Sequence, residues 1–325
     1  MRSGRAIGAI AATASLALLA ACGSSASSGS QGSNLVIATQ PDLGYAPLYI
    51  VEQEGWLNKA LPGIHVKWET LNSGSAMETG MVSGNIDVGA GGVAPFILGS
   101  SKGVGWKLLS SLDEANLQLV TKPSITSVKS IGPKDKIAVV APTSIQAIVL
   151  KAAAQKYLGD PNKLDQNLTI MPHPVAYQSF RSGSIAGALD APPFQGEEVK
   201  AGGHALLGSW ELFGTSTFNS VFVLPSFYNS HEKEMKVLYQ QIQRAVNLLN
   251  TNPDQAAQIL SAHEHGTLTA AAAKTDITSS SIHYTVTPKG YLAYAKFMKS
   301  IGLIDQVPSS INDLELPTLH GTAGS

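Results

Sequence analysis

The sequence predicts an α/β fold made of two similar lobes. Short apolar runs that suit buried strands alternate with amphipathic stretches that suit helices, a pattern typical of mainly parallel sheets. The alternation occurs in two successive blocks of the chain, each with a strand, a loop and a helix that starts at Ser or Thr. The length of 325 residues corresponds to about two domains of ordinary size.

In the first block, apolar runs predict strands at residues 35–39, 64–69, 86–90, 106–112 and 117–120. A turn at residues 41–45 precedes a predicted helix at 46–53. A second helix begins after residues 72–75, carries Met77 and Met81 on one face, and ends at Gly84. A short third helix is predicted at 95–98.

The second block predicts strands at residues 136–140, 168–170, 186–189 and 221–224, and a helix at 175–182. Another helix starts at Ile145, has apolar residues at helical spacing, and stops at Gly159. The remaining chain is predicted to be helical, with segments at 235–250, after Asn252, and from Thr287 to Gly302. We expect these C-terminal helices to return to the first lobe.

Composition excludes several classes of protein. The formal net charge is −1 and only 14% of residues are charged, so the chain lacks the basic stripe of a nucleic-acid-binding protein. A single Cys excludes a disulfide scaffold and a zinc site built from Cys. We therefore expect no nucleic-acid partner, no metal and no cofactor.

The N-terminus has the layout of a secretory signal, with Arg2 and Arg5 before an apolar run at 6–21 that is too short to span a membrane comfortably. The run ends in Leu-Ala-Ala-Cys, which resembles the bacterial lipobox and predicts lipidation of Cys22. Residues 22–34, rich in Ser and Gly, read as a tether. We expect a protein anchored by lipid to the extracytoplasmic face of the cell membrane. The alternative is an ordinary signal peptide with an incidental Cys22.

Two loops follow predicted strands and open predicted helices, at residues 72–75 and 141–144. Ligands of open α/β sheets bind beyond the carboxyl ends of strands, where helix N-termini present free N–H groups. Ser75 and Ser144 in these loops suit an anion or a carbonyl group. The alternative is that each serine only caps its own helix.

Acidic and aromatic residues at predicted loop ends form a further set of candidates: Asp42, Tyr45, Phe96, Tyr177, Asp190 and Phe194. Asp190 follows an apolar strand and precedes Ala-Pro-Pro, which makes it the most informative of them. Asp42 has an alternative role as the cap of a turn, and Phe96 has one as a core residue.

Motifs for catalysis are weak in this sequence. Residues 99–103 match G-x-S-x-G, but a nucleophile elbow needs a strand before Ser101 and a helix after it, and here the order is reversed. The His-Glu-His run at 263–265 places its histidines off a common helix face and reads as a solvated helix end. His173, between two prolines, reads as a structural residue or a wall of the site. These features favour binding over catalysis.

Taken together, these segments resemble the bacterial ABC-transporter substrate-binding proteins of the sulfonate/nitrate/taurine and thiamine-precursor type. The resemblance covers almost all of the chain after the tether. It is carried by the order of the pieces PDLGYAPLYIVEQEGWL (41–57), NSGSAMETGMVSGNIDVGAGGVAPFILG (72–99), LQLVTKPSI (117–125), KIAVVAPTSIQAIVL (136–150) and NPDQAAQIL (252–260).

The resemblance implies a type II periplasmic-binding-protein fold with two lobes, two crossing strands and a ligand cleft. Lobe I would comprise residues 35–121 and 222–325, and lobe II residues 122–221. Together with the candidates above, it implies these ligand-binding residues: Asp42, Tyr45, Gly74, Ser75, Gly92, Val93, Thr143, Ser144, Tyr177, Asp190 and Phe194. The chain departs from the family pattern at Ala186, where an acid is common, and in the segment 190–193, so no particular substrate follows.

The resemblance implies a monomeric protein that captures a small molecule between its lobes and delivers it to an ABC permease. A sulfonate-type anion would use the helix N-termini, although no Arg or Lys adjoins either loop. A neutral or cationic heterocycle would use Asp42, Asp190 and aromatic walls, and we favour the neutral heterocycle. The alternatives are an exported enzyme on the same fold, with hydrolase or pyrimidine-type chemistry, and a surface lipoprotein without a ligand.

Overall fold

The structure is a computed structural model that describes residues 34–316. The predicted signal segment 1–21, Cys22 and the tether up to residue 33 lie outside the described residues. Strand β1 (Asn34–Thr39) begins at the last residue assigned to the tether. Leu35 and Ile37 are buried in the sheet and fix the register of this strand. In that register Asn34 pairs with His65, so the strand includes Asn34.

The first sheet has five strands in the order β2-β1-β3-β11-β4. The bounds of the other four are β2 (His65–Thr70), β3 (Val88–Gly92), β4 (Lys107–Ser111) and β11 (Asn219–Val223). Strand β1 pairs in parallel with β2 and β3, whereas β11 is antiparallel to both of its neighbours. Every residue of β3 and of β11 is buried, as expected for central strands covered on both faces.

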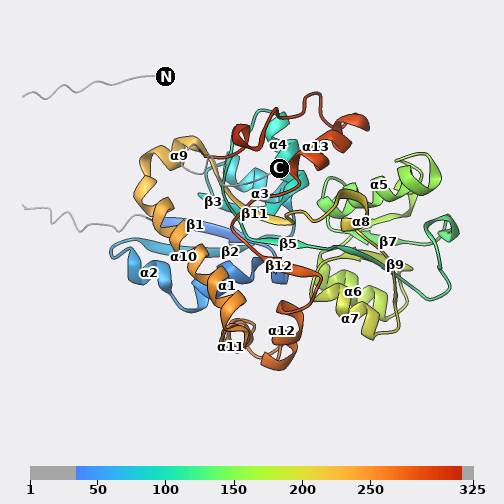
Figure 1. Ribbon diagram of the computed structural model, residues 1–325, viewed down its shortest axis with the longest axis horizontal. Helices are drawn as coiled ribbons and strands as arrows, with labels where there is room; N and C mark the ends of the chain where they lie inside the picture. Colours follow the sequence, from blue (N-terminus) through green and yellow to red (C-terminus); the bar gives the residue numbers. More distant parts are fainter. Residues whose placement is uncertain (1–33, 317–325) are drawn as a thin grey trace, which may run out of the picture. The chain divides into compact units, whose positions relative to one another are not determined.

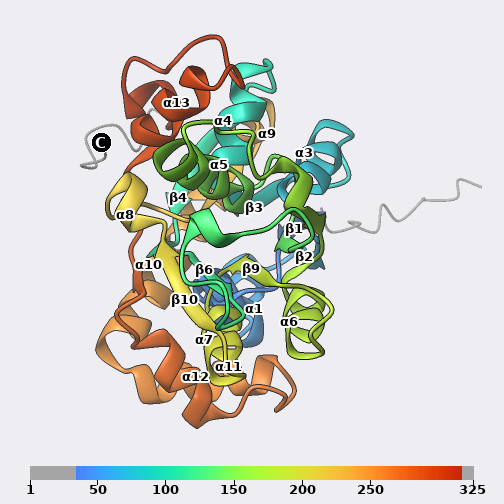
Figure 2. The same ribbon diagram turned by 90° about the vertical axis from the view of Figure 1, so that its right-hand side faces the viewer.

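The second sheet repeats this plan, with the order β10-β6-β9-β7-β8. Its strands are β6 (Gln118–Thr121), β7 (Ile137–Val139), β8 (Leu168–Ile170), β9 (Gly187–Asp190) and β10 (His204–Gly208). Strand β7 is parallel to β8 and β9, and β6 is antiparallel to β9 and β10. Thus β6 occupies the position in the second sheet that β11 occupies in the first. The two sheets with their helices form two lobes, which confirms the α/β class (Figures 1 and 2).

The chain enters the second sheet through β6 and returns to the first through β11. A small antiparallel pair, β5 (Asp113–Ala115) with β12 (Ile282–Tyr284), lies next to these crossings. The lobe boundaries at 121/122 and 221/222 stay predictions. Strand pairing favours earlier boundaries, because all of β6 pairs within the second sheet and all of β11 within the first.

Helices cover both sheets. Those from the first part of the chain are α1 (Ala46–Gln53), α2 (Trp56–Ala60), α3 (Gly74–Val82) and α4 (Val93–Ser101). Those around the second sheet are α5 (Ile145–Leu158), α6 (His173–Arg181), α7 (Phe194–Lys200) and α8 (Trp210–Phe213). Short 3₁₀ turns occur at η1 (Leu43–Tyr45), η2 (Val128–Ser130), η3 (Asp165–Asn167) and η4 (Ile311–Asp313). Within the described range, none of the helices is both long enough and apolar enough to cross a membrane.

The C-terminal helices return to the first lobe, as expected. They are α9 (Pro225–Ser230), α10 (Glu232–Thr251), α11 (Pro253–His263), α12 (Ala270–Ile277) and α13 (Tyr291–Ser300). Helices α10 and α11 pack against α1, and α13 packs against α4. Helix α10 is amphipathic and buries Leu238, Ile242 and Leu249 on one face, so apolar burial holds this segment against the first lobe.

Some local predictions were wrong. The last helix begins at Tyr291 rather than at residues 287–288, because the backbone N–H of Lys289 bonds to Thr217 and Gly290 takes a left-handed conformation with φ of +79°. Helices α2, α7 and α8 and strands β5 and β10 were not expected, and strand β12 lies in the part of the chain predicted to be helical. Each has at most seven residues, too few for a hydrophobic period to emerge.

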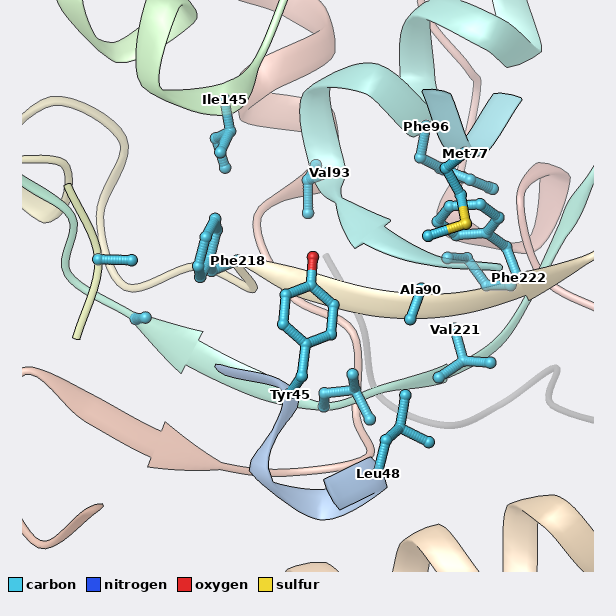
Figure 3. Close-up of a cluster of buried hydrophobic side chains, with 14 of the residues drawn as sticks. Tyr45, Leu48, Met77, Ala90, Val93, Phe96, Ile145, Phe218, Val221 and Phe222 are labelled. Atoms are coloured by element: carbon cyan, nitrogen blue, oxygen red, sulfur yellow. The ribbon is translucent and has the colours of Figure 1, made fainter. Parts of the chain in front are cut away.

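Phe96, one of the candidates for the site, lies in the aromatic core of the first lobe (Figure 3). Phe96 is fully buried, and its ring lies 5.7 Å from that of Trp106 and 5.4 Å from that of Phe222. The indole N–H of Trp106 donates to the Phe96 carbonyl at 3.0 Å. Phe96 is therefore a core residue, as its alternative role predicted.

Candidate functional site

The turn after β1 joins the two sheets. Asp42 caps η1, and its Oδ1 accepts hydrogen bonds from the backbone N–H of Gly44 at 2.7 Å and from Nδ2 of Asn219 at 3.1 Å. The backbone N–H of Leu43 donates to the carbonyl of Pro192, beyond β9, at 3.0 Å. Asp42 therefore caps its turn, as its alternative role predicted, and in addition lies where the lobes meet.

A small inner chamber of about 20 Å³ lies on one side of Asp42. Its lining residues come from the ends of β1, β3 and β7, from the start of β11 and from α3, α4, α5 and α6: Gln40, Asp42, Tyr45, Gly74, Gly92, Pro95, Val140, Ser144, Ile145, Gln146, His173, Phe218 and Asn219. Figure 3 shows Ile145 of the second lobe facing Val93 and Phe218 of the first. A space of this size holds about one water molecule, so in this conformation it has no room for a sulfonate.

Hydrogen bonds fix the polar floor of the inner chamber. The Tyr45 hydroxyl donates to Oδ1 of Asn219 at 3.0 Å and accepts from Nε2 of Gln40 at 2.9 Å. Asn219 also donates its backbone N–H to Oδ1 of Asp113 at 2.8 Å. Burial raises the pKa of Tyr45 and that of Asp113 well above their ordinary values. Tyr45 is therefore a neutral hydroxyl that holds Asn219, and through it Asp42, in place.

A larger outer cavity of about 740 Å³ lies on the other side of Asp42. Its lining residues are Pro41, Asp42, Leu43, Tyr49, Thr70, Pro174, Tyr177, Pro193, Phe194, Glu197, His263, Glu264, His265, Thr267, Leu268, Thr269 and Ala272. They come from the ends of β1 and β2, from α6 and α7, and from the turn between α11 and α12. In Figures 1 and 2, α6 and α7 of the second lobe lie beside α11 and α12. Volumes of this order are typical of small-molecule sites.

His173 lies between two carboxyl groups at the lobe junction. Its Nδ1 hydrogen-bonds to Oδ1 of Asp190, and its Nε2 lies 3.9 Å from Oδ2 of Asp42. Burial lowers the pKa of His173, but the charges of Asp190 and Asp42 more than offset this, so that pKa lies above its ordinary value. Burial, partly offset by His173, raises the pKa of Asp42 to about 7. We call Asp42, His173 and Asp190 the junction cluster.

Glu198 extends the junction cluster into the second lobe. This side chain is fully buried, and neither of its carboxyl oxygens has a hydrogen-bond partner within the described residues. Burial, followed by the neighbouring Asp190, raises the pKa of Glu198 to about 10. Glu198 is therefore neutral at physiological pH, and the negative charge of this region stays with the junction cluster.

A second histidine lies between carboxylates at the outer cavity. His263 hydrogen-bonds through Nδ1 to Glu264 at 3.1 Å and through Nε2 to Glu52 at 3.3 Å. Burial lowers its pKa, and the hydrogen bonds to Glu264 and Glu52 raise it by more, to about 9. Its ring stacks on that of Tyr49 at 4.4 Å. The prediction of a merely solvated helix end was wrong, because this end of α11 packs against α1. We call Glu52, His263 and Glu264 the rim cluster.

The two Ser-containing loops differ from each other. Ser144 caps α5 by accepting from the backbone N–H of Ala147 at 3.3 Å, and it also lines the inner chamber. In the other loop the cap is Ser73, which accepts from Ala76 at 3.3 Å. Ser75 is exposed and bonds to the Ser73 hydroxyl, so it neither caps the helix nor lines a cavity.

The remaining candidates divide between the two spaces. Tyr45, Gly74 and Gly92 line the inner chamber, whereas Tyr177 and Phe194 line the outer cavity. Four candidates line neither one: Ser75, Val93, Thr143 and Asp190. Val93 is buried with its backbone N–H bonded to the Phe218 carbonyl, and Asp190 lies behind His173. The binding roles of all eleven candidates stay predictions.

The sequence interpretation missed several lining residues. Gln40 directly follows β1, Asn219 lies in β11 and Gln146 in α5, and none of them gave a local signal. His173 was identified only as a wall or structural residue, and its ring lies parallel to that of Phe194 at 5.8 Å. Tyr49 lies on the face of α1 that packs under α11, which periodicity alone assigns to the core.

The G-x-S-x-G match has no nucleophile elbow. Ser101 is the last residue of α4, and its hydroxyl donates to the carbonyl of Leu98 at 2.7 Å. Within residues 34–316, no group of three or more side chains of the types that bind metals is placed to hold an ion.

Comparison of the sequence with models of protein families finds a match. The model of the NMT1-like family matches residues 28–262, which is most of the chain. The chain belongs to the NMT1-like family. No curated protein sequence matches this NMT1-like protein.

Solved structures agree with the fold of this NMT1-like protein. The ligand-binding component of an ABC-type import system from Staphylococcus aureus, with zinc bound, is 16% identical, with a TM-score of 0.71 over 90% of this chain and 99% of that one. The periplasmic aliphatic sulphonate binding protein of Escherichia coli is 17% identical, with a TM-score of 0.66 over 87% and 92%. The periplasmic nitrate-binding protein of Synechocystis is 14% identical, with a TM-score of 0.69 over 86% and 84%. The expected two-lobed periplasmic-binding-protein fold is thereby confirmed.

Proposed function

We propose that this protein is an extracytoplasmic solute-binding protein that captures a small organic molecule between its lobes and delivers it to an ABC permease. The observation that carries the proposal is the outer cavity of about 740 Å³, whose walls come from elements of both lobes. A ligand that contacts both lobes stabilises the form in which they are together by its differential affinity for that form. Such capture needs no covalent step.

The names of similar structures support this proposal. They describe a component of an ABC-type importer and periplasmic proteins that bind sulphonate or nitrate. We propose that the ligand of this chain differs in kind, because no Lys or Arg is among the described residues that line either space. We therefore propose an organic ligand without a net negative charge, and a neutral heterocycle fits the aromatic walls of the outer cavity.

Native mass spectrometry of the protein purified from its host tests capture directly. We expect a small molecule to be released on activation, and its addition to the stripped protein to raise the melting temperature. At about 100 times Kd the ligand adds roughly 2.7 kcal/mol to the unfolding free energy. Protein that releases no molecule and gains no stability from any metabolite of its host would contradict capture.

Variants of the cavity wall make this test specific. Tyr177→Ala and Phe194→Ala each remove a half-buried ring from the outer cavity, and we expect each to weaken binding of the identified ligand at least about tenfold. Tyr157→Ala is the matched control, because this ring lies on α5 outside both spaces. Equal losses in all three variants would indicate a general effect on folding.

We further propose that Cys22 carries a lipid that holds the protein at the outer face of the membrane. The support is the single Cys of the chain at the end of a lipobox-like segment. Labelling of cells with an alkyne analogue of palmitate should mark the wild-type protein and not Cys22→Ser. The variant should also leave the membrane fraction, and unchanged labelling would contradict the anchor.

A further inference from the structure

Two side-chain clusters border the outer cavity, and each has one histidine between two carboxyl groups. In the junction cluster, His173 lies between Asp42 and Asp190. In the rim cluster, His263 lies between Glu52 and Glu264. With every member ionised, each cluster has one negative charge in excess, because a single imidazolium faces two carboxylates.

The remaining charges at the cavity do not cancel this excess. Glu197 on the wall pairs with Lys200 at 2.7 Å, so that pair adds no net charge. His265, also on the wall, is exposed to solvent. No Lys or Arg is among the lining residues of the described chain. A net charge at a partly buried wall attracts an opposite charge more strongly than the same net charge in bulk water does.

One carboxylate oxygen has unused hydrogen-bonding capacity at this wall. Both hydrogen bonds that the Asp42 side chain accepts within the described residues go to Oδ1. Its Oδ2 lies 3.9 Å from Nε2 of His173, beyond hydrogen-bonding distance. Asp42 is 5% exposed and lines both the chamber and the cavity. A carboxylate oxygen that faces a cavity without a donor favours a ligand that brings one.

The other walls suit an apolar body. Tyr49, Tyr177 and Phe194 supply rings, and Leu43 and Leu268 supply aliphatic surface. The Tyr49 ring is held by stacking on His263, and its hydroxyl donates to the carbonyl of Gln40. Aromatic faces stabilise an adjacent cation through their quadrupoles as well as contacting flat ligands.

Resting on the proposed capture function, we propose that the ligand is an organic cation: an ammonium or protonated ring nitrogen donates to Oδ2 of Asp42, and an aromatic or alkyl body fills the outer cavity. This replaces the neutral heterocycle favoured above by a cation of similar body, and it separates the chain from the sulphonate- and nitrate-binding proteins of similar fold. The cation contacts Asp42 at the first lobe and the rings of α6 and α7 at the second, so its charge is recognised where the lobes meet.

Three probes with one ring and different charge test the proposal: benzylamine, benzyl alcohol and phenylmethanesulfonate. Their affinities would be measured by ligand-observed saturation-transfer NMR on the full chain at about pH 8, where Asp42 is ionised. We expect benzylamine to bind at least about tenfold more tightly than the other two. Equal or tighter binding of the alcohol or the sulfonate would overturn the cation proposal and leave capture intact.

Substitutions test whether residues of the outer cavity cause the preference for benzylamine. We expect Asp42→Asn, which keeps the shape of the side chain, to reduce the benzylamine preference to less than about threefold. Glu264→Gln removes a charge at the rim and should reduce it without disturbing the buried junction cluster. Glu232→Gln is the control, since this exposed residue of α10 pairs with Lys236 away from the cavity. A preference that persists in both cavity variants, or falls equally in the control, would overturn the assignment.

The molecule released in native mass spectrometry decides the case in which no probe binds. A released cation supports the proposal, and a released anion or uncharged molecule overturns it while leaving capture intact. The absence of both probe binding and a released molecule would overturn capture as well, so the two failures remain distinguishable.

Discussion

Nε2 of His173 lies 3.9 Å from Oδ2 of Asp42, and this approach joins α6 of the second lobe to the η1 turn of the first. Nδ1 of the same ring bonds to Asp190 at the end of β9. Nearby, the backbone of Leu43 donates to the carbonyl of Pro192. The lobes therefore meet at a buried titratable group, and its protonation is linked to the stability of the fold.

The first prediction concerns pH. The pKa of Asp42 rises from 3.8 to about 7 on folding, mainly through burial. Between these values the folded state binds more protons than the unfolded state, so this carboxyl lowers stability as pH rises. Asp42→Asn removes the effect. We expect the variant to gain on the order of 1–3 kcal/mol over the wild type at about pH 8 and little at about pH 4.

Other groups at Asp42 leave the sign of this prediction unchanged. His173 and Asp190 face it from the second lobe, and Asp113 lies beyond Asn219 in the first. The raised pKa of His173 contributes stability that is full below its unfolded pKa and is lost as pH rises through its folded pKa. Thermal melts of both proteins from acid to alkaline pH measure the difference. A difference that shrinks as pH rises would refute the assignment.

The second prediction concerns Glu198, which is fully buried and whose carboxyl oxygens have no hydrogen-bond partner in residues 34–316. Because its pKa rises to about 10 on folding, the unfolded state releases this proton at much lower pH. Glu198→Gln should therefore raise the unfolding free energy at about pH 7 by on the order of 1–3 kcal/mol, and the gain should fall toward about pH 4. Denaturant titration measures it, with exposed Glu232→Gln as the control that should change stability by less than about 0.5 kcal/mol.

The third prediction compares two helical glycines. A Cβ on Gly99 in α4 would lie 2.2 Å from the Trp106 ring, whereas a Cβ on Gly196 in α7 meets nothing within 4 Å. Gly99→Ala overpacks the core and should cost about 1–3 kcal/mol or more. Gly196→Ala should be neutral or gain up to about 1 kcal/mol, because alanine favours the helix. Similar melting temperatures for the two variants would mean that Trp106 moves freely away from Gly99.

The fourth prediction separates the two serines at the start of α3. Ser73 accepts from the backbone N–H of Ala76, whereas Ser75 is exposed and its hydroxyl bonds only to the Ser73 hydroxyl among the described residues. Ser73→Ala should cost about 1 kcal/mol through loss of the cap, and Ser75→Ala less than about 0.5 kcal/mol. Urea denaturation of the paired variants checks this. A larger loss in Ser75→Ala would reverse the assignment of the cap.

Much of the fold was predictable because its signals are local. Helix α5 begins at Ile145, after the Ser144 cap, and ends before Gly159 as predicted, since a serine cap and a left-handed glycine with φ of +76° act within one turn. Helix α1 has its predicted bounds for the same kind of reason, with Pro47 in its first turn. The repeated order of strands and helices likewise predicted two lobes.

The candidate site was predictable only in part. Asp42, Tyr177 and Phe194 were identified from their places at strand and helix ends, and the structure puts all three on one cavity. The pairing of His173 and of His263 with carboxyl groups could not be predicted from the sequence. Each depends on carboxylates brought from another element, Asp42 for the first and Glu52 for the second.

By itself, the sequence determined most of the longer strands and helices, because hydrophobic period and capping act over a few neighbouring residues. Only the tertiary structure decided which titratable groups share a buried site. Asp42, His173 and Asp190 come from three different elements, and they meet because β1 and β9 end at the same junction of two sheets. Burial there raises the pKa of Asp42, since desolvation depends on everything packed around a group and not on its neighbours in the chain.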